Sequence, residues 1–198
     1  MSLNPVISLL GRRLRLAVIG GGAGSFIGAM HRHTAALDNR YELVAAALSS
    51  NPERGLHAGR ELGLADNRVY ASGLALIAGE KGHSSGADVV AIMTPNDSHF
   101  ELASAALDAG FDVICDKPMT NTLDEAERLH AAVETSGLTF CLTHNYTGYP
   151  MVRQARAMVD AGELGTIRLV QVEYVQGGNA RENDPARAQS WRHDPVKG

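Results

Sequence analysis

Lys117 is the residue of this sequence whose setting most suggests chemistry. It stands in the motif Asp116-Lys117-Pro118, directly after an apolar run over residues 111–115 that is typical of a buried strand. Open α/β sheets bind ligands at the carboxyl ends of their strands, and Pro118 restricts the residue before it to an extended backbone. An ammonium held there can donate a hydrogen bond to a hydroxyl that is being oxidised and stabilise the oxyanion that develops as hydride leaves. The alternative is an ordinary solvated lysine.

A turn rich in glycine is the second candidate site, because it joins an apolar run over residues 14–19 to a helix-length segment. Glycines let the backbone approach a pyrophosphate closely, and the free amides at the start of a helix stabilise its charge. We therefore expect cofactor contacts from Gly20, Gly22, Gly24, Ser25, Phe26 and Ile27. The strict Gly-x-Gly-x-x-Gly spacing is absent, since Gly28 comes later than that pattern allows, so a turn without a ligand is the alternative. No Gly-Lys-Ser/Thr sequence is present, which argues against a P-loop.

The residues after the next apolar run, 42–48, bear on which dinucleotide would bind. An Asp or Glu at this point normally hydrogen-bonds the ribose hydroxyls and repels a 2′-phosphate, but this chain has Ser49, Ser50 and Asn51 there. Arg54 follows about one helical turn later, and hydroxyl donors with a guanidinium can accommodate a 2′-phosphate. The expected cofactor is therefore NAD or NADP, with NADP favoured. The alternative is that Asn51 only caps its helix and Arg54 is solvated.

Two further polar residues follow apolar runs at other points of the chain. His99 begins the helix after the sequence Thr94-Pro95-Asn96, and it either contacts the cofactor or only satisfies a local hydrogen bond. Asn145 follows the apolar run that ends near residue 143, which would bring it to the same crevice as a contact of cofactor or substrate.

A parallel sheet would bring these residues together, and the pattern of the chain predicts one. Short apolar runs alternate with helix-length segments up to about residue 145, and such crossover connections require a parallel, doubly wound sheet. The expected strands cover residues 14–19, 42–48, 69–70 (weakly), 88–93, 111–115 and 139–143. The expected helices cover residues 25–37, 52–63, a short segment ending near 82, 99–109, 122–137 with a capping box at its start, and a segment from 150 to about 162.

The pattern changes after residue 145. Residues 166–174 are expected to form a long strand with partly polar alternation, as in an antiparallel sheet with one wet face, and no strand is expected from 177 to 198. The predicted fold is a Rossmann-type doubly wound parallel sheet followed by the beginning of an α+β domain with a mainly antiparallel sheet. We assign residues 1–148 to a dinucleotide-binding domain and residues 149–198 to an incomplete substrate and oligomerisation domain.

The composition argues against several classes of partner. The chain is 44% hydrophobic with a net charge of −4 and has no concentrated basic patch, so no nucleic acid is expected. No apolar run reaches membrane-spanning length and no small-residue cleavage site is present, so neither a membrane nor secretion is expected. Cys115 and Cys141 each end an apolar run typical of a buried strand, and we expect reduced structural thiols without a metal, which suits the cytoplasm.

Four motifs of this chain resemble those of one family. They are Gly28-Ala29-Met30-His31, Thr94-Pro95-Asn96-Asp97-Ser98-His99, Cys115-Asp116-Lys117-Pro118 and Gly162-Glu163-Leu164-Gly165. Over about residues 14–174 their order and spacing resemble the glucose-fructose oxidoreductase, inositol dehydrogenase and rhizopine-catabolism (Gfo/Idh/MocA) family. The departures are a longer glycine turn and Asp116 where Glu is commoner.

The resemblance implies an NAD(P)-dependent dehydrogenase that transfers hydride between a nicotinamide and a secondary alcohol of a sugar, cyclitol or related polyol. Lys117 would be catalytic, and Asp116 would stand among the cofactor contacts. The nicotinamide ribose would be lined by Thr94, Pro95 and Asn96. By the same analogy the full-length protein would be a homodimer or homotetramer.

The resemblance also implies a catalytic residue that this sequence lacks. In the family an Asp-x-x-x-His motif in the second domain supplies the general acid-base partner of the lysine, but residues 165–198 contain no such motif. The stretch Trp191-Arg192-His193-Asp194-Pro195 resembles the one just before it, so we expect the chain alone to be inactive. One alternative is a dinucleotide-binding or regulatory protein without chemistry. A methyltransferase that uses S-adenosylmethionine is disfavoured by Lys117 and by Thr94-Pro95-Asn96.

Overall fold

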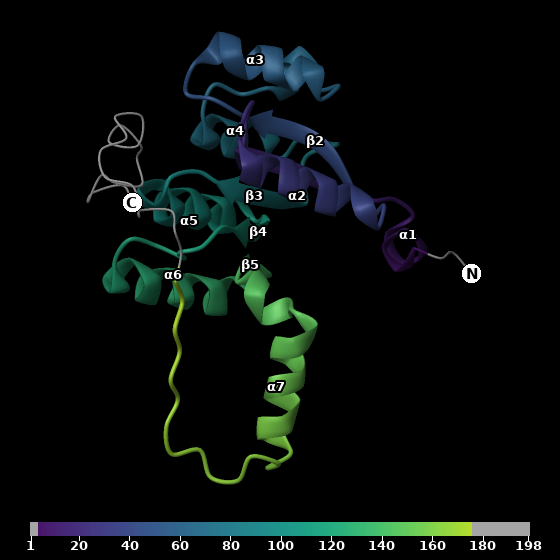
Figure 1. Cartoon of the computed structure of the whole chain (residues 1–198). Coiled ribbons are helices and arrows are strands. Elements are labelled where there is room, and N and C mark those ends of the chain that lie inside the picture. The colour runs from purple at the N-terminus through teal and green to yellow at the C-terminus, as the bar shows by residue number, and fades with distance from the viewer. Residues whose placement is uncertain (1–3, 176–198) are drawn as a thin grey trace. The chain divides into compact units, whose positions relative to one another are not determined.

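The computed structural model of the chain describes residues 4–175 (Figure 1). The chain divides between Thr143 and His144 into two compact units, whereas the sequence analysis places the boundary between residues 148 and 149. The first unit contains a parallel sheet with helices on both faces.

Five parallel strands form this sheet, which confirms the predicted α/β class. They are β1 (Leu14–Gly20), β2 (Tyr41–Ala47), β3 (Val89–Met93), β4 (Asp112–Cys115) and β5 (Phe140–Leu142). Their spatial order is β2-β1-β3-β4-β5, so the strand order reverses between β1 and β3, where doubly wound sheets bind their ligands. The weak strand predicted at residues 69–70 is only a single bridge from Val69 to Ala46 of β2. A 3-10 turn before it and the next helix cap after it leave too few extended residues for a strand.

The helices begin and end with the expected local signals. Ser25 caps α2 (Phe26–Leu37), Asn51 caps α3 (Pro52–Glu61), and α6 (Leu123–Ser136) has the predicted capping box. The remaining helices are α1 (Pro5–Leu10), which sequence analysis missed, α4 (Gly73–Glu80), α5 (His99–Ala109) and α7 (Pro150–Asp160), with 3-10 turns η1 (Asp66–Arg68), η2 (Asn96–Ser98) and η3 (Asn145–Gly148). Of the helices within residues 4–175, none is both long and apolar enough to cross a membrane.

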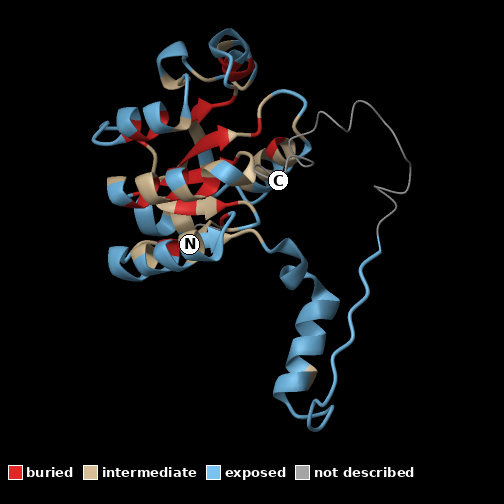
Figure 2. Ribbon diagram, turned by 90° about the vertical axis from the view of Figure 1, so that its left-hand side faces the viewer, coloured by how far each residue is buried: buried red, intermediate tan, exposed pale blue. Residues whose placement is uncertain are grey.

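The core consists of two apolar layers, one on each face of the sheet. Along β1, Ala17 and Ile19 pack with residues of α4, α5 and α6, whereas Leu16 and Val18 pack on the face that α2 and α3 cover. All five residues of β3 are buried, as expected for a strand covered on both faces. Figure 2 shows the buried residues concentrated in the strands between the helices. These layers hold the carboxyl ends of the parallel strands at one edge of the sheet.

The two cysteines lie in different environments. Cys115 at the end of β4 is buried, and this burial, together with the charge of Asp116, raises the pKa of its thiol to about 12. Cys141 is exposed, so the prediction that both cysteines lie on buried strands is wrong for this residue. The reason is that β5 stands at the edge of the described sheet.

The described part of the second unit contains η3 and α7, followed by residues 161–175 without regular structure. The strand predicted at residues 166–174 is therefore wrong. A strand needs a neighbouring backbone for its hydrogen bonds, and no described segment pairs with this one. The polar stretch 177–198, with the motif Trp191–Pro195, lies outside the described residues.

Candidate functional site

The turn between β1 and α2 brings backbone rather than side chains to the sheet edge. Three of its glycines have positive φ angles, a region that L side chains rarely adopt: Gly20 (82°), Gly21 (67°) and Gly24 (77°). A Cβ on Gly20 would come within 2.7 Å of the Met93 carbonyl oxygen on β3, and one on Gly22 would overlap the Leu48 carbonyl oxygen. A pyrophosphate that approached this turn would meet main-chain atoms.

Gly28 belongs to the same turn, although the spacing rule leaves it out. Its Cα lies against Gly21, and an added Cβ would overlap the Gly21 carbonyl. Close packing of the helix on the turn is the role of the third glycine in the usual motif, so the longer turn has moved that glycine to position 28. Arg32, one turn further along α2, donates a 2.7 Å hydrogen bond to the Gly21 carbonyl. Sequence reasoning missed this role of Gly28 and the contact of Arg32.

The start of α2 offers a site for an anion. The hydroxyl of Ser25 accepts a 3.2 Å hydrogen bond from the Gly28 amide, whereas the amides of Phe26 and Ile27 have no place in the helical hydrogen-bond pattern. The partial positive charge of the helix N-terminus attracts phosphate. The Phe26 side chain is exposed, but that of Ile27 packs in the core, so only the backbone of Ile27 is available to a ligand.

The segment after β2 has both a helix cap at Asn51 and an exposed guanidinium at Arg54. Asn51 caps α3 by accepting a 2.9 Å hydrogen bond from the Arg54 amide, and Ser49 Oγ accepts one of 3.1 Å from the Asn51 amide. Ser50 and the Arg54 side chain are exposed. The cap is therefore present, and it leaves the Arg54 guanidinium able to contact a phosphate.

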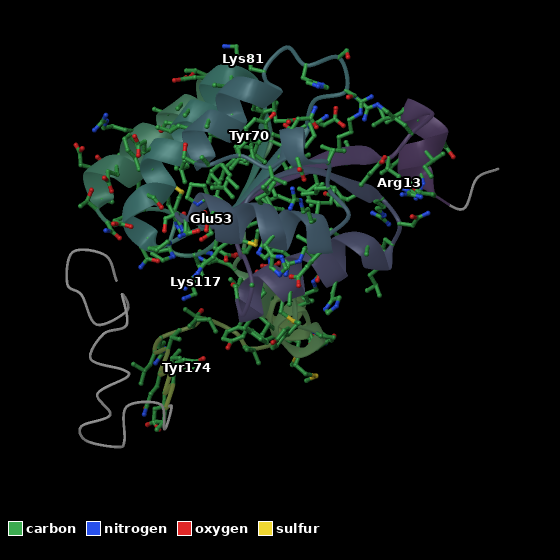
Figure 3. The ribbon with its side chains drawn as sticks, turned by 90° about the horizontal axis from the view of Figure 1, so that it is seen from above. Arg13, Glu53, Tyr70, Lys81, Lys117 and Tyr174 are labelled. Carbon is green, nitrogen blue, oxygen red and sulfur yellow. The ribbon has the colours of Figure 1, made fainter. Side chains whose placement is uncertain are left out.

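The strand ends that carry the predicted site residues lie at one edge of the sheet. β3 pairs in parallel with both β1 and β4, so β4 stands two strands from β1, about 10 Å at the usual spacing. Figure 3 looks down on the strands: Glu53 and Lys117, which follow β2 and β4, lie on one side of the first unit, and Arg13, which precedes β1, lies on the other. The structure therefore brings the glycine turn and Lys117 to the same edge.

The residues after β3 lie between the glycine turn and Lys117. Thr94, Pro95 and Asn96 are half-buried. The Ser98 hydroxyl holds their turn, lying 2.7 Å from Thr94 Oγ1 and 2.8 Å from the Pro95 carbonyl oxygen. This position between the glycine turn and Lys117 agrees with the predicted placement beside a nicotinamide ribose, which stays a prediction.

Lys117 is exposed, and its peptide bond to Pro118 is cis. Asp116 before it is anchored on three sides. The Asp116 amide donates to the Ile92 carbonyl at 3.0 Å, and Oδ1 of its carboxylate lies 3.0 Å from His31 Nε2 and accepts a 2.7 Å hydrogen bond from Thr143 Oγ1. Because His31 lies on α2, this contact ties the helix of the glycine turn directly to the end of β4.

The charge of Asp116 follows from this setting. Burial raises the pKa of its carboxyl, but the hydrogen bonds from His31 and Thr143 and the charges of His31 and His99 outweigh burial and hold the pKa below its ordinary value of 3.8. The side chains of His31 and Asp116 are each 14% exposed, so the pair is mostly withdrawn from solvent. Asp116 is thus an ionised anchor for the residue beside it. Its predicted contact with the cofactor stays a prediction.

The prediction that His99 contacts the cofactor is wrong. The residue is 0% exposed, and its ring nitrogens lie 2.7 Å from the Pro118 carbonyl oxygen and 3.0 Å from the Thr94 carbonyl oxygen. The alternative, a local hydrogen-bonding role, is what the structure shows. The physical reason is that the ring points from the start of α5 into the core between the ends of β3 and β4.

Asn145 begins η3 in the second unit and is exposed, so its contact with cofactor or substrate stays a prediction. Within residues 4–175, no three His, Cys, Asp or Glu side chains gather as a metal site would require.

Comparisons with known proteins agree with this geometry. The model of the Gfo/Idh/MocA oxidoreductase family, which has an NAD-binding Rossmann fold, matches residues 14–157. The chain is 37% identical over 191 residues to the uncharacterized oxidoreductase YfiI of Bacillus subtilis, a match that covers 95% of this chain and 49% of that protein. It is 30% identical over 188 residues to levoglucosan dehydrogenase of Pseudarthrobacter phenanthrenivorans, covering 91% of this chain and 45% of that enzyme.

A solved structure is similar to this chain in fold as well as in sequence. An inositol dehydrogenase homolog from Azotobacter vinelandii, complexed with NAD+, superposes with a TM-score of 0.86 at 37% identity, covering 94% of this chain and 48% of that one. This chain spans about half the length of the curated relatives that it matches. The family model covers most of the chain and both motif-bearing strand ends, and the chain therefore belongs to the Gfo/Idh/MocA family of NAD(P)-dependent oxidoreductases.

Proposed function

We propose that the chain is the dinucleotide-binding part of a dehydrogenase that transfers hydride between a nicotinamide and a secondary alcohol of a sugar, cyclitol or related polyol. The observation that carries the proposal is that the glycine turn and Lys117 lie at one sheet edge, two strands apart, with the His31–Asp116 contact between them. The names of two similar proteins, a levoglucosan dehydrogenase and an inositol dehydrogenase homolog, favour this class of substrate.

The glycine turn fits a nicotinamide dinucleotide. Side chains at positions 20 and 22 would collide with the backbone of neighbouring strand ends, so the turn keeps its main chain open to a pyrophosphate. The amides at the start of α2 then hydrogen-bond the phosphate oxygens. When bound, the nicotinamide supplies the ring carbon to which or from which hydride moves.

Lys117 acts on the substrate. Its ammonium donates a hydrogen bond to the hydroxyl oxygen whose carbon loses hydride, and it stabilises the negative charge that develops on that oxygen. Asp116 holds the strand end in place and takes no proton, because its ionised carboxylate is engaged by His31 and Thr143. We expect the acid-base partner of Lys117 on a second domain, so the chain alone binds the cofactor without turnover.

We further propose a preference for NADP over NAD. Hydroxyl groups rather than a carboxylate follow β2, and the exposed side chain of Arg54 is able to pair with a 2′-phosphate. We also propose that the full-length protein works in the cytoplasm and self-associates as a dimer or tetramer.

Titration of the chain with NADH and NADPH, followed by nucleotide fluorescence, tests the binding site. We expect both to bind, NADPH more tightly, and S-adenosylmethionine not to compete; failure of both nucleotides to bind would refute the proposal.

A screen of sugars and cyclitols with the complete protein tests the chemistry, and binding without turnover on every polyol would favour the regulatory alternative. Lys117→Ala should remove most turnover and spare nucleotide binding. Lys81→Ala is the matched control, because Lys81 is also exposed and lies across the first unit from Lys117 (Figure 3).

A further inference from the structure

His99 is a buried histidine beside the proposed site for which the mechanism so far has no use. It is the first residue of α5 and is fully enclosed. Its Nδ1 lies 2.7 Å from the carbonyl oxygen of Pro118, and its Nε2 lies 3.0 Å from the carbonyl oxygen of Thr94. The ring therefore bridges the two strand ends between which a nicotinamide and a substrate would meet.

The chemistry of these two partners restricts the form of the ring. A carbonyl oxygen only accepts hydrogen bonds, and a neutral imidazole has one N–H donor and one lone pair. A neutral ring would therefore turn a lone pair towards one of the two carbonyl oxygens at hydrogen-bonding distance. Both contacts are favourable together only when each nitrogen carries a proton.

The surroundings supply the counter-charge that a buried cation needs. The carboxylate of Asp116, which is held ionised, stands two residues before Pro118 at the same strand end. The peptide dipoles of Thr94 and Pro118, whose oxygens face the ring, add to this stabilisation.

We propose that His99, with a proton on each ring nitrogen, is a positioning residue: its Nδ1–H holds the Lys117–Pro118 backbone at the start of α5, and its Nε2–H holds the end of β3. Asp116 fixes the residue before Lys117, and His99 fixes the carbonyl of the residue after it, so the main chain of Lys117 is held on both sides. A lysine placed in this way presents its ammonium to the substrate with less freedom than one on an open loop. The reactivity of a site depends steeply on such placement, with about 100-fold losses for displacements near 1 Å.

The ring protons are tested directly on the unsubstituted chain, and this arm needs no enzymatic activity. Nitrogen-15 spectra of histidine rings, with His99 assigned from its own backbone, show whether one or both nitrogens carry hydrogen. We expect two slowly exchanging N–H groups on His99 at neutral pH. A single N–H, with the other nitrogen showing the shift of a lone pair, would overturn the proposal even if every variant failed to fold.

Two substitutions separate the two contacts. In His99→Asn the side-chain amide takes the place of Nδ1 and keeps the donor to Pro118, whereas in His99→Gln the amide takes the place of Nε2 and keeps only the donor to Thr94. The complete protein with His99→Asn should retain kcat within about threefold. His99→Gln should lower kcat about 10- to 100-fold while the Kd for the nucleotide stays within about twofold.

The inference rests on the proposed dehydrogenase function for its kinetic arm only. If the unsubstituted protein turned over no polyol, the proposed function would fail. The contact of His99 with Pro118 would still be tested by the ring spectra and by the amide shifts of Lys117 and Met119, which should change in His99→Gln more than in His99→Asn. Equal kcat in both variants and the parent protein would overturn the positioning role. Parallel losses of kcat and nucleotide affinity in both variants would do the same, because they indicate general damage to the fold.

Discussion

Substitution of Gly22 by alanine tests the assignment of the glycine turn. The φ angle at this position is open to alanine, so the change acts through the added Cβ, which would overlap the Leu48 carbonyl oxygen. The Cβ is fixed to the backbone of the turn and the group it meets is a main-chain carbonyl, so either the turn or the end of β2 must move. Overpacking of this kind costs about 1–3 kcal/mol, and at about 3 °C per kcal/mol for a unit of this size the Tm should fall by about 3–9 °C.

The effect on nucleotide binding should be larger than the effect on stability alone suggests. The displaced amides lose charge-assisted hydrogen bonds to phosphate, each worth about 1.5–3 kcal/mol, so the Kd for the preferred nucleotide should rise about 10- to 100-fold. Calorimetric titration of the folded variant measures this loss. Gly148→Ala is the matched control, because a Cβ there meets no atom within 4 Å, and it should change neither quantity.

One pattern of results would exclude a pyrophosphate site at the turn. If Gly22→Ala lowered the Tm as expected but bound the nucleotide with a Kd within about twofold of the parent chain, the close approach to Leu48 would be a packing feature only. The pyrophosphate would then lie elsewhere.

Three further substitutions test other parts of the site. Lys117→Ala should lower kcat of the complete protein about 10²- to 10⁴-fold and leave the nucleotide Kd unchanged, and equal loss in the control Lys81→Ala would contradict its role. Asp116 has a pKa held below 3.8, so its ionised form stabilises the fold above about pH 4, and this contribution disappears as the pH falls through the lowered pKa. Urea denaturation should therefore show Asp116→Asn to be less stable than the parent by about 2 kcal/mol at pH 7, with a deficit that shrinks as the pH falls below about 4, whereas a deficit independent of pH would argue against an ionised anchor. Arg54→Ala should weaken NADPH binding about tenfold and leave NADH unchanged; a chain that already prefers NADH would overturn the assignment of NADP.

The strands and helix ends of the first unit were predictable because their signals are local. The apolar run of Val89–Met93 is typical of a strand buried on both faces, and the structure buries all of it. Thr122 and Glu125 form a capping box whose two hydrogen bonds involve neighbouring residues, and Gly137 ends the same helix at a φ of 69°. The sequence signal for each of these features lies within a few neighbouring residues.

Gly28 and His99 show where local reasoning stops. The contact of Gly28 with Gly21 depends on the path of a turn longer than the common motif, which residue spacing does not reveal. For His99 a signal was available, since Leu102, Ala103 and Ala106 follow it at helical spacing and are all buried, which places the histidine on the apolar face of α5. The motif that ends in His99, Thr-Pro-x-x-x-His, instead suggested a contact with the cofactor.

Residues 166–174 mark a different limit. Their partly polar alternation is compatible with a strand, but a strand exists only where another backbone completes its hydrogen bonds. The described residues contain no such neighbour, so the same sequence pattern is found here as an irregular segment. Propensity alone cannot decide such a case.

The most direct test of the account is a titration of the nitrogen-15-labelled chain with the preferred nucleotide. We expect the amides of Gly22, Ser25 and Lys117 to shift together along one binding curve, because one dinucleotide spans the turn after β1 and the end of β4. Saturation of the shifts at Gly22 and Ser25 with no change at Lys117 would contradict the claim that both belong to a single site.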